Sequence, residues 1–150
     1  MSLKFKIKVP GTSANIGVGY DCLGVALDYY LEIEVTESET IEFVENGKEF
    51  SIPLDENLMF EAANFTQKKL NKTIPNYRVN IIRNDIPIAR GLGSSSSAIV
   101  AGIMIVNRFL NNKLDRDSIA KLAVEMEGHP DNVVPAIFGG MVLAAHDKEN

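Results

Sequence analysis

Glycines and serines crowd together between Arg90 and Ser97, in the sequence RGLGSSSS, and of all the stretches in this 150-residue chain this one best suits a ligand. A long apolar stretch, AIVAGIMIVNRFL, follows directly and is typical of a buried helix. The serines are therefore predicted to form the first turn of that helix. A helix start leaves about four backbone N–H groups unpaired and carries a partial positive charge, which suits a phosphate group. Glycine permits close approach of the oxygens, and a serine hydroxyl can donate to them or coordinate Mg2+.

Helix capping is the simpler explanation of such a loop, because serine is a favoured N-cap residue. A cap needs one serine, however, and four stand here in succession. The P-loop of common nucleoside triphosphatases is excluded, because no lysine follows Gly93. The stretch therefore predicts a phosphate site of another kind.

Two further groups of polar residues could hold a ligand. His129, Asp131 and Asn132 stand within four residues, directly before another apolar segment. Asn15 and Asp21 lie in a glycine-rich segment, SANIGVGYD. Both groups have a simpler explanation, because Asp and Asn also cap helices and form Asx turns. The residues alone leave the two explanations open.

The elements around these groups are predicted from hydrophobic periodicity and turn residues. Alternation with period two predicts strands at 4–10, 25–38, 40–52 and 77–84, with a tight hairpin turn at Asn46-Gly47 and a loop at 11–24. Amphipathic or buried helices are predicted at 57–70, 95–110 and 115–128, and a short strand at 139–146. In the first helix Leu58, Ala62 and Phe65 have the spacing of a buried face. The predicted fold class is α+β: a twisted, mostly antiparallel sheet with helices packed on one face.

Composition narrows the class of protein. The chain is 45% hydrophobic and 23% charged, and no apolar run reaches the length of roughly 18 residues that a membrane span needs. A net charge of -5 argues against broad binding of nucleic acid. Cys22 is the only cysteine, which excludes an internal disulfide and fits a reducing cytoplasm. We expect a cytoplasmic protein with small-molecule partners, no nucleic acid and no membrane. The sequence leaves a homodimer open.

Three motifs, in order along the chain, resemble a known family. PIARGLGSSSSA resembles the second motif of the GHMP kinases, in which this loop wraps the phosphates of ATP. PGTSANIGVGYDCLGVALD is similar to the N-terminal signature of the homoserine kinases in that superfamily, and EGHPDNVVPAIFGG to their acceptor-site signature. The resemblance spans Pro10 to Gly140. It implies the GHMP kinase N-terminal fold, which resembles one used in ribosomal proteins, and ATP-dependent phosphorylation of L-homoserine with Mg2+ as cofactor.

The resemblance also implies roles for single residues. The nucleotide contacts are Asn57, for adenine, and for the phosphates Pro87, Arg90, Gly91, Leu92, Gly93, Ser94, Ser95, Ser96 and Ser97. Mg2+ is held by Ser95 and Glu125, with Ser94 and Glu127 as the alternatives. Asp131 orients or deprotonates the acceptor hydroxyl beside Asn132, and these two are the expected catalytic residues. The amino acid is held by His129, Asn15 and Asp21 together with Asp131 and Asn132. Asn57 also suits an N-cap, and Cys22 and His146 receive no role.

Homoserine kinases are about twice this length, and their second domain supplies arginines for the substrate carboxylate. We therefore expect residues 1–150 to be an N-terminal ATP-binding domain, incomplete at its C-terminal end and without the C-terminal domain, with weak or no turnover alone. Two alternatives stay open: another GHMP kinase of the mevalonate type, and a noncatalytic, nucleic-acid-associated domain of the same fold. The acidic balance argues against the second alternative.

Overall fold

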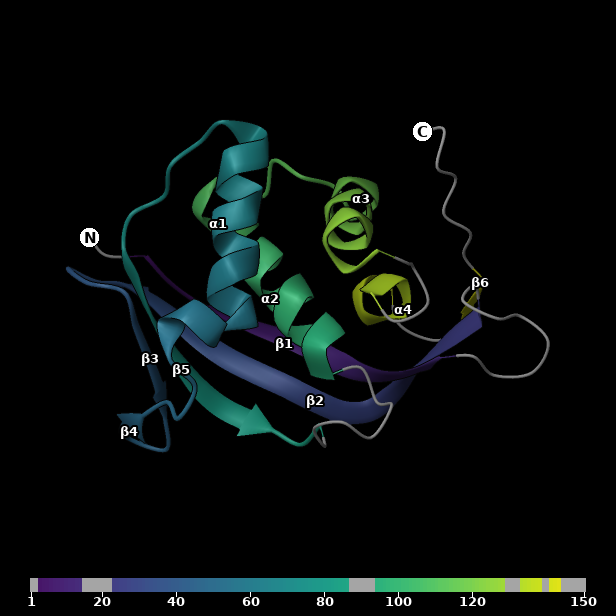
Figure 1. Cartoon of the computed structure of the whole chain (residues 1–150), viewed down its shortest axis with the longest axis horizontal. Helices are drawn as coiled ribbons and strands as arrows, with labels where there is room; N and C mark the ends of the chain where they lie inside the picture. Colours follow the sequence, from purple (N-terminus) through teal and green to yellow (C-terminus); the bar gives the residue numbers. More distant parts are fainter. Residues whose placement is uncertain (1–2, 15–22, 87–93, 129–132, 139–140, 144–150) are drawn as a thin grey trace.

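The computed structural model describes residues 3–14, 23–86, 94–128, 133–138 and 141–143. In these parts of the chain one sheet carries helices on a single face (Figure 1). Its strands are β1 (Lys4–Ala14), β2 (Leu23–Glu37), β3 (Glu42–Glu45), β4 (Lys48–Glu49), β5 (Tyr77–Asn84) and β6 (Met141–Leu143). The helices are the 3-10 turn η1 (Leu54–Glu56), α1 (Leu58–Leu70), α2 (Ser94–Phe109), α3 (Arg116–Glu127) and α4 (Val133–Phe138).

The sheet is mostly antiparallel, as predicted. Its strand order is β1-β2-β5-β3-β4, with β6 paired to the beginning of β2. The β3–β5 pair is parallel, and the other described pairs are antiparallel. The α+β prediction is therefore confirmed. No helix in the described ranges is long and apolar enough to cross a membrane.

Strand β1 shows why the alternation in the sequence was informative. Phe5, Ile7 and Val9 are buried beneath the helices, whereas Lys4 and Lys6 are exposed on the opposite face. The predicted loop at 11–24 is wrong at both ends, because β1 continues to Ala14 and β2 begins at Leu23. A proline was expected to stop the strand at position 10. Among the described strands β1 pairs only with β2, and a bulge between Pro10 and Thr12 shifts the register, so the missing N–H of proline is tolerated.

The hairpin between β3 and β4 also forms as predicted. Asn46 and Gly47 have φ values of 52° and 76°, in the left-handed region that a type I′ turn requires at both central positions. Asparagine and glycine are the residues that adopt this region most readily. The turn therefore follows from two adjacent residues alone.

Helix α2 lies at the centre of the molecule, between the sheet and helices α1 and α3 (Figure 1). Gly102 allows α1 to approach closely, since a Cβ atom there would lie 2.3 Å from the Met59 carbonyl oxygen and 2.7 Å from the Ala62 Cβ atom. The buried face of α1 consists of Met59, Ala62, Ala63 and Thr66. Leu58 and Phe65, predicted on that face, stay partly exposed. Spacing alone could not show that small residues must face the crossing with α2.

Tyr77 belongs to an aromatic cluster beneath the last turn of α2. Its ring packs edge-on against Phe43, at a centroid distance of 6.2 Å, and lies tilted against Phe109 at the same distance. The side chain is buried, and its hydroxyl has no hydrogen-bond partner among the described residues. Burial raises the pKa of this hydroxyl well above its usual range, because the phenolate would lose its hydration.

The crossing at Gly102 predicts that Gly102→Ala destabilises the fold. Helix propensity alone would stabilise this variant by roughly 1 kcal/mol. A Cβ at 2.3 Å from a backbone oxygen must instead push α1 away, which we expect to lower the free energy of unfolding by about 2 kcal/mol or more. Urea denaturation followed by circular dichroism measures the change. Ala98→Gly on the same helix serves as the control for propensity, and a stabilised Gly102→Ala variant would contradict the close crossing.

The buried hydroxyl predicts that Tyr77→Phe folds at least as stably as the original chain at neutral pH, because a buried polar group without a partner costs about 1–3 kcal/mol. The pKa of Tyr77 is raised in the folded state, so its contribution to stability is complete below the ordinary tyrosine pKa of about 10 and is lost as the pH rises above it. Tyr77→Phe should therefore lose less stability than the original chain between pH 7 and about pH 11. Denaturation curves at both pH values test this. Identical losses in the two proteins would show that Tyr77 does not cause the loss of stability at alkaline pH.

Candidate functional site

The serine run forms the first turn of α2, as the sequence predicted, with the helix beginning at Ser94. Successive helical residues point about 100° apart, so neighbouring serines face different surroundings. Ser95 is exposed, whereas Ser96 and Ser97 are fully buried. The side chain of Ser94 is not described. The serines are therefore not equivalent, although the sequence presents them as a uniform run.

The two buried hydroxyls donate hydrogen bonds inside the protein. Ser96 Oγ donates to Glu127 Oε1 at 3.3 Å, and Ser97 Oγ donates to the Pro10 carbonyl oxygen at 2.9 Å. A hydroxyl has a single proton to donate. While these bonds are in place, neither side chain can donate to a phosphate, although their backbone N–H groups still face the helix start. Among the serines of this turn whose side chains are described, Ser95 is thus the one that is open to a ligand.

Glu127 and Glu125 lie in the last turn of α3 and have different partners. This helix has Asp115 as its N-cap, with the Ser118 N–H donating to it at 2.8 Å, and it ends at Gly128 in a left-handed conformation with φ 100°. Glu127 is half-buried beside the serine turn. Glu125, half exposed, forms an ion pair with Lys69 of α1. The structure therefore brings Glu127, the alternative metal ligand, to the serine turn and pairs Glu125 with a cation.

Asn57 is the N-cap of α1, as one of its two interpretations predicted. Its Oδ1 accepts from the Phe60 N–H at 3.2 Å, and the side chain is 3% exposed. The other half of the amide, Nδ2, is buried and has no partner among the residues that the structure describes. Most buried polar atoms in proteins have a partner, so an unpaired NH2 group marks a position where a ligand acceptor would fit.

Most of the other predicted site residues fall outside the described parts of the chain. These are Asn15, Asp21, Pro87, Arg90, Gly91, Leu92, Gly93, His129, Asp131 and Asn132. Their predicted roles stay predictions. Two interactions at the site were not predicted. The Pro10 carbonyl oxygen accepts a hydrogen bond from Ser97, and Lys69 forms an ion pair with Glu125. Neither has a signal in the sequence, because both contacts join distant segments.

The oxygen atoms at the serine turn suit a magnesium ion better than a metal that needs three or more protein ligands. Within the described ranges no group of three His, Cys, Asp or Glu side chains could hold a metal ion. A serine hydroxyl and a glutamate carboxylate offer hard oxygen ligands of the kind that Mg2+ prefers. Mg2+ also keeps several waters and takes further oxygens from phosphates, so it needs few protein ligands.

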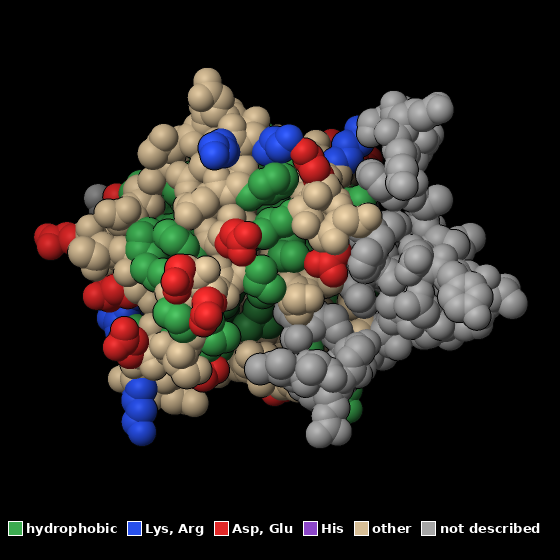
Figure 2. All heavy atoms as spheres, viewed as in Figure 1, with side chains coloured by type: hydrophobic (Ala, Val, Ile, Leu, Met, Phe, Trp, Pro, Cys, Tyr) green, Lys and Arg blue, Asp and Glu red, His purple; other side chains and the backbone are tan. Residues whose placement is uncertain are grey.

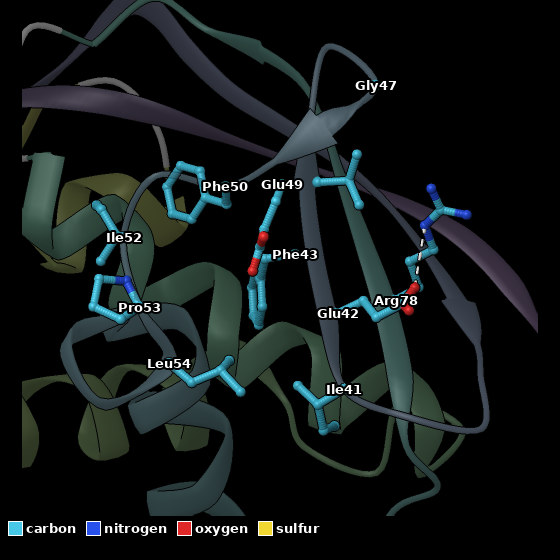
Figure 3. A pocket seen from close by; sticks show the side chains of 11 residues that line it. Ile41, Glu42, Phe43, Gly47, Glu49, Phe50, Ile52, Pro53, Leu54 and Arg78 are labelled. Carbon is cyan, nitrogen blue, oxygen red and sulfur yellow. Dashed lines mark ion pairs between the residues drawn. The ribbon is translucent and has the colours of Figure 1, made fainter.

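A cavity of about 410 Å3 lies apart from the serine turn, beside the β3–β4 hairpin (Figure 3). Its apolar walls include Ile41, Phe43 and Phe50, and an ion pair of 3.7 Å between Arg78 and Glu42 lies at one side. Acidic side chains lie among the hydrophobic ones in this region of the surface (Figure 2). None of the predicted site residues lines the cavity. We therefore centre the candidate site on the start of α2.

The chain is similar to known proteins along nearly its full length. It is 48% identical to a homoserine kinase of Clostridium novyi, over 97% of this chain and 49% of that protein. A solved chain from Listeria monocytogenes, whose homoserine kinase assignment is provisional, is 35% identical with a TM-score of 0.82, over 97% of this chain and 51% of that one. The homoserine kinase of Cytophaga hutchinsonii is 27% identical with a TM-score of 0.77, over 93% of this chain and 48% of that one.

The chain spans about half the length of the curated relatives it matches. A family model described as the N-terminal domain of the GHMP kinases matches residues 57–140, a range that contains α1, the serine turn and α3. The sheet with helices on one face and the serine turn at the start of its central helix agree with that match. The chain therefore belongs to the GHMP kinase family, and residues 57–140 match the N-terminal domain of that family.

Proposed function

We propose that this chain is the N-terminal, ATP-binding part of an enzyme that transfers the γ-phosphoryl group of ATP to the side-chain hydroxyl of L-homoserine. The products are ADP and O-phospho-L-homoserine, an intermediate on the way to threonine. Curated relatives at 40% to 48% identity are homoserine kinases, which supports this choice of substrate. We place the reaction in the cytoplasm, consistent with a single cysteine.

The observation that carries the proposal is the start of α2. The first turn of this 16-residue helix presents backbone N–H groups and the exposed Ser95, with a carboxylate, Glu127, on the adjoining helix end. Phosphoryl transfer depends mainly on positioning and on neutralising charge, and this arrangement offers donors for phosphate and oxygen ligands for a cation. When bound, Mg2+ would neutralise charge on the transferring phosphate. Ser95 would hold it, together with Glu125 or Glu127.

We assign the binding of homoserine, the phosphate acceptor, to residues in the segments that resemble the family signatures. Asp131 would orient the homoserine hydroxyl or accept its proton, beside Asn132, and His129 would help to hold the amino acid. An unperturbed aspartate has a pKa near 4 and is a weak base at neutral pH. A loose transition state needs little deprotonation before transfer, so orientation alone can suffice. Asn15 and Asp21 would complete the pocket, with Asp21 facing the substrate ammonium.

Asn57 would contact the adenine of ATP. Its Oδ1 is occupied by the N-cap bond, so the unpaired Nδ2 is the group that remains to donate to a ring nitrogen. Binding ATP would thus satisfy a buried donor that has no partner among the described residues. In this assignment Oδ1 of Asn57 caps the helix and Nδ2 contacts the adenine. A substitution can therefore remove the adenine contact while keeping the cap.

We predict that Asn57→Asp weakens ATP binding about tenfold, because it keeps an oxygen for the N-cap but removes the Nδ2 donor. Calorimetric titration with Mg-ATP measures the affinity. Asp115→Ala removes a cap of the same kind from α3, away from the proposed adenine, and serves as the control for loss of a cap. Equal affinities of Asn57→Asp and the original chain would exclude an adenine contact through Nδ2.

We predict that ADP formation by this chain in the presence of Mg2+ is weak, and that homoserine, and not mevalonate, stimulates whatever turnover it has. A coupled assay for ADP with each alcohol tests the choice of substrate. Stimulation by mevalonate alone would reassign the chain to another branch of the GHMP kinases. Tight Mg-ATP binding without stimulation by either alcohol would assign nucleotide binding, but not transfer, to these 150 residues.

A further inference from the structure

We propose that Ser97 is a positioning residue that holds the first turn of α2 on strand β1, so that the backbone N–H groups of this turn are aligned with the phosphates of a nucleotide. This inference rests on the proposed function. The hydroxyl of Ser97 acts here through the backbone and not as a phosphate ligand, because it donates to the Pro10 carbonyl oxygen at 2.9 Å.

Local preferences do not explain a serine at position 97. The residue is fully buried and lies inside α2. Alanine has the higher helix propensity at such a position, and a buried hydroxyl without a partner is costly. A serine inside a helix can satisfy its hydroxyl on a carbonyl of the same helix. Ser97 instead donates to β1, at a residue 87 positions away in the chain. The bond between distant segments therefore accounts for the hydroxyl.

The acceptor of this bond lies at an irregularity of the sheet. Pro10 stands at the bulge where the register of β1 on β2 shifts, between Pro10 and Thr12. Gly11 and Thr12 are buried, and β1 is the strand on which α2 chiefly packs. A bulge bends its strand locally and changes the direction of neighbouring groups. The bulge thus coincides with the place where β1 carries the serine turn.

The bond also joins two of the sequence motifs. Pro10 begins the motif PGTSANIGVGYDCLGVALD, and Ser97 belongs to PIARGLGSSSSA. Strand β1 leads directly into the segment that contains Asn15 and Asp21, the residues proposed for homoserine. The turn proposed for the phosphates is therefore fixed relative to the strand that leads into the acceptor segment. Phosphoryl transfer is sensitive to such alignment, since small displacements of the reacting groups lower the rate strongly.

The adenine contact is held separately from this turn. Asn57, proposed for adenine, lies at the start of α1 and is fixed there by its own cap bond to the Phe60 N–H. Loss of the Ser97 bond leaves that cap in place. Adenosine, which has no phosphates, therefore reports on the adenine contact alone, and Mg-tripolyphosphate, which has no nucleoside, reports on the phosphate turn alone.

The test is Ser97→Ala, which removes one oxygen atom and its bond to β1. Calorimetry on the full chain, at a temperature where melting curves show every variant folded, measures the affinities for Mg-ATP, Mg-tripolyphosphate and adenosine. The variant should bind Mg-ATP and Mg-tripolyphosphate about tenfold more weakly, and adenosine within about twofold of the original chain. Ser97→Cys keeps a weak donor of similar size, so its affinity for Mg-ATP should lie between the other two.

Thr66→Val is the matched control. It removes a fully buried hydroxyl whose hydrogen bond, 2.8 Å to the Ala62 carbonyl oxygen, lies within α1 and connects nothing to the serine turn. This variant should keep Mg-ATP affinity within about twofold while losing some thermal stability. The comparison separates the loss of any buried hydroxyl from the loss of the link to β1.

Three results would overturn the inference. If Ser97→Ala binds Mg-ATP within about twofold of the original chain, the bond serves stability alone. If Ser97→Ala weakens Mg-ATP and adenosine by the same factor, the substitution disturbs the whole nucleotide site and not the alignment of the phosphate turn. If the original chain does not bind Mg-ATP, the proposed function itself fails and the inference fails with it. In the first two results the original chain still binds, so the proposed function survives.

Discussion

The close crossing of α1 and α2 at Gly102 is the contact on which the rest of the arrangement depends. Helix α2 is apolar on almost every side and must be enclosed by the sheet, α1 and α3. At Gly102 the Met59 carbonyl and Ala62 approach so closely that no side chain fits. This contact fixes the point at which α1 and α2 cross and how closely they approach. The first turn of α2, which carries the candidate site, is held on the sheet by the bond from Ser97 to the Pro10 carbonyl oxygen of β1.

The elements around this crossing satisfy local rules that agree with the overall fold. Asn57 and Asp115 cap their helices, Gly128 ends α3 in the left-handed region, and Asn46-Gly47 closes the hairpin. Agreement between local preference and tertiary position is typical of a chain with one favoured structure. Some exceptions fall on predicted site residues: the unpaired amide of Asn57 and the glutamates at the C-terminal end of α3. Another, the unpaired hydroxyl of Tyr77, lies at the opposite end of α2 from the serine turn. Exceptions at site residues are where function is expected to override local stability.

The site is assembled from segments that are far apart in the chain. Ser97 bonds to Pro10, 87 residues away, and Ser96 bonds to Glu127, 31 residues away. Each bond uses a buried hydroxyl, so each costs stability if its partner is lost. A turn held in this way is fixed before a ligand arrives. Preorganised donors are the kind of arrangement that stabilises charge during phosphoryl transfer.

The sequence by itself determined the fold class, the hairpin turn, the extent of the helix that ends before Gly128 and the place of the serine turn at the start of a buried helix. These features depend on residues close together in the chain, and their periodicity and turn preferences can be recognised directly in the local sequence. Tertiary structure alone decided that β1 passes through Pro10, that small residues of α1 face Gly102, and that Ser95, Ser96 and Ser97 have different surroundings. It also separated Glu125, paired with Lys69, from Glu127, paired with Ser96. Those outcomes depend on which distant segments come into contact, and the local sequence pattern does not predict such contacts.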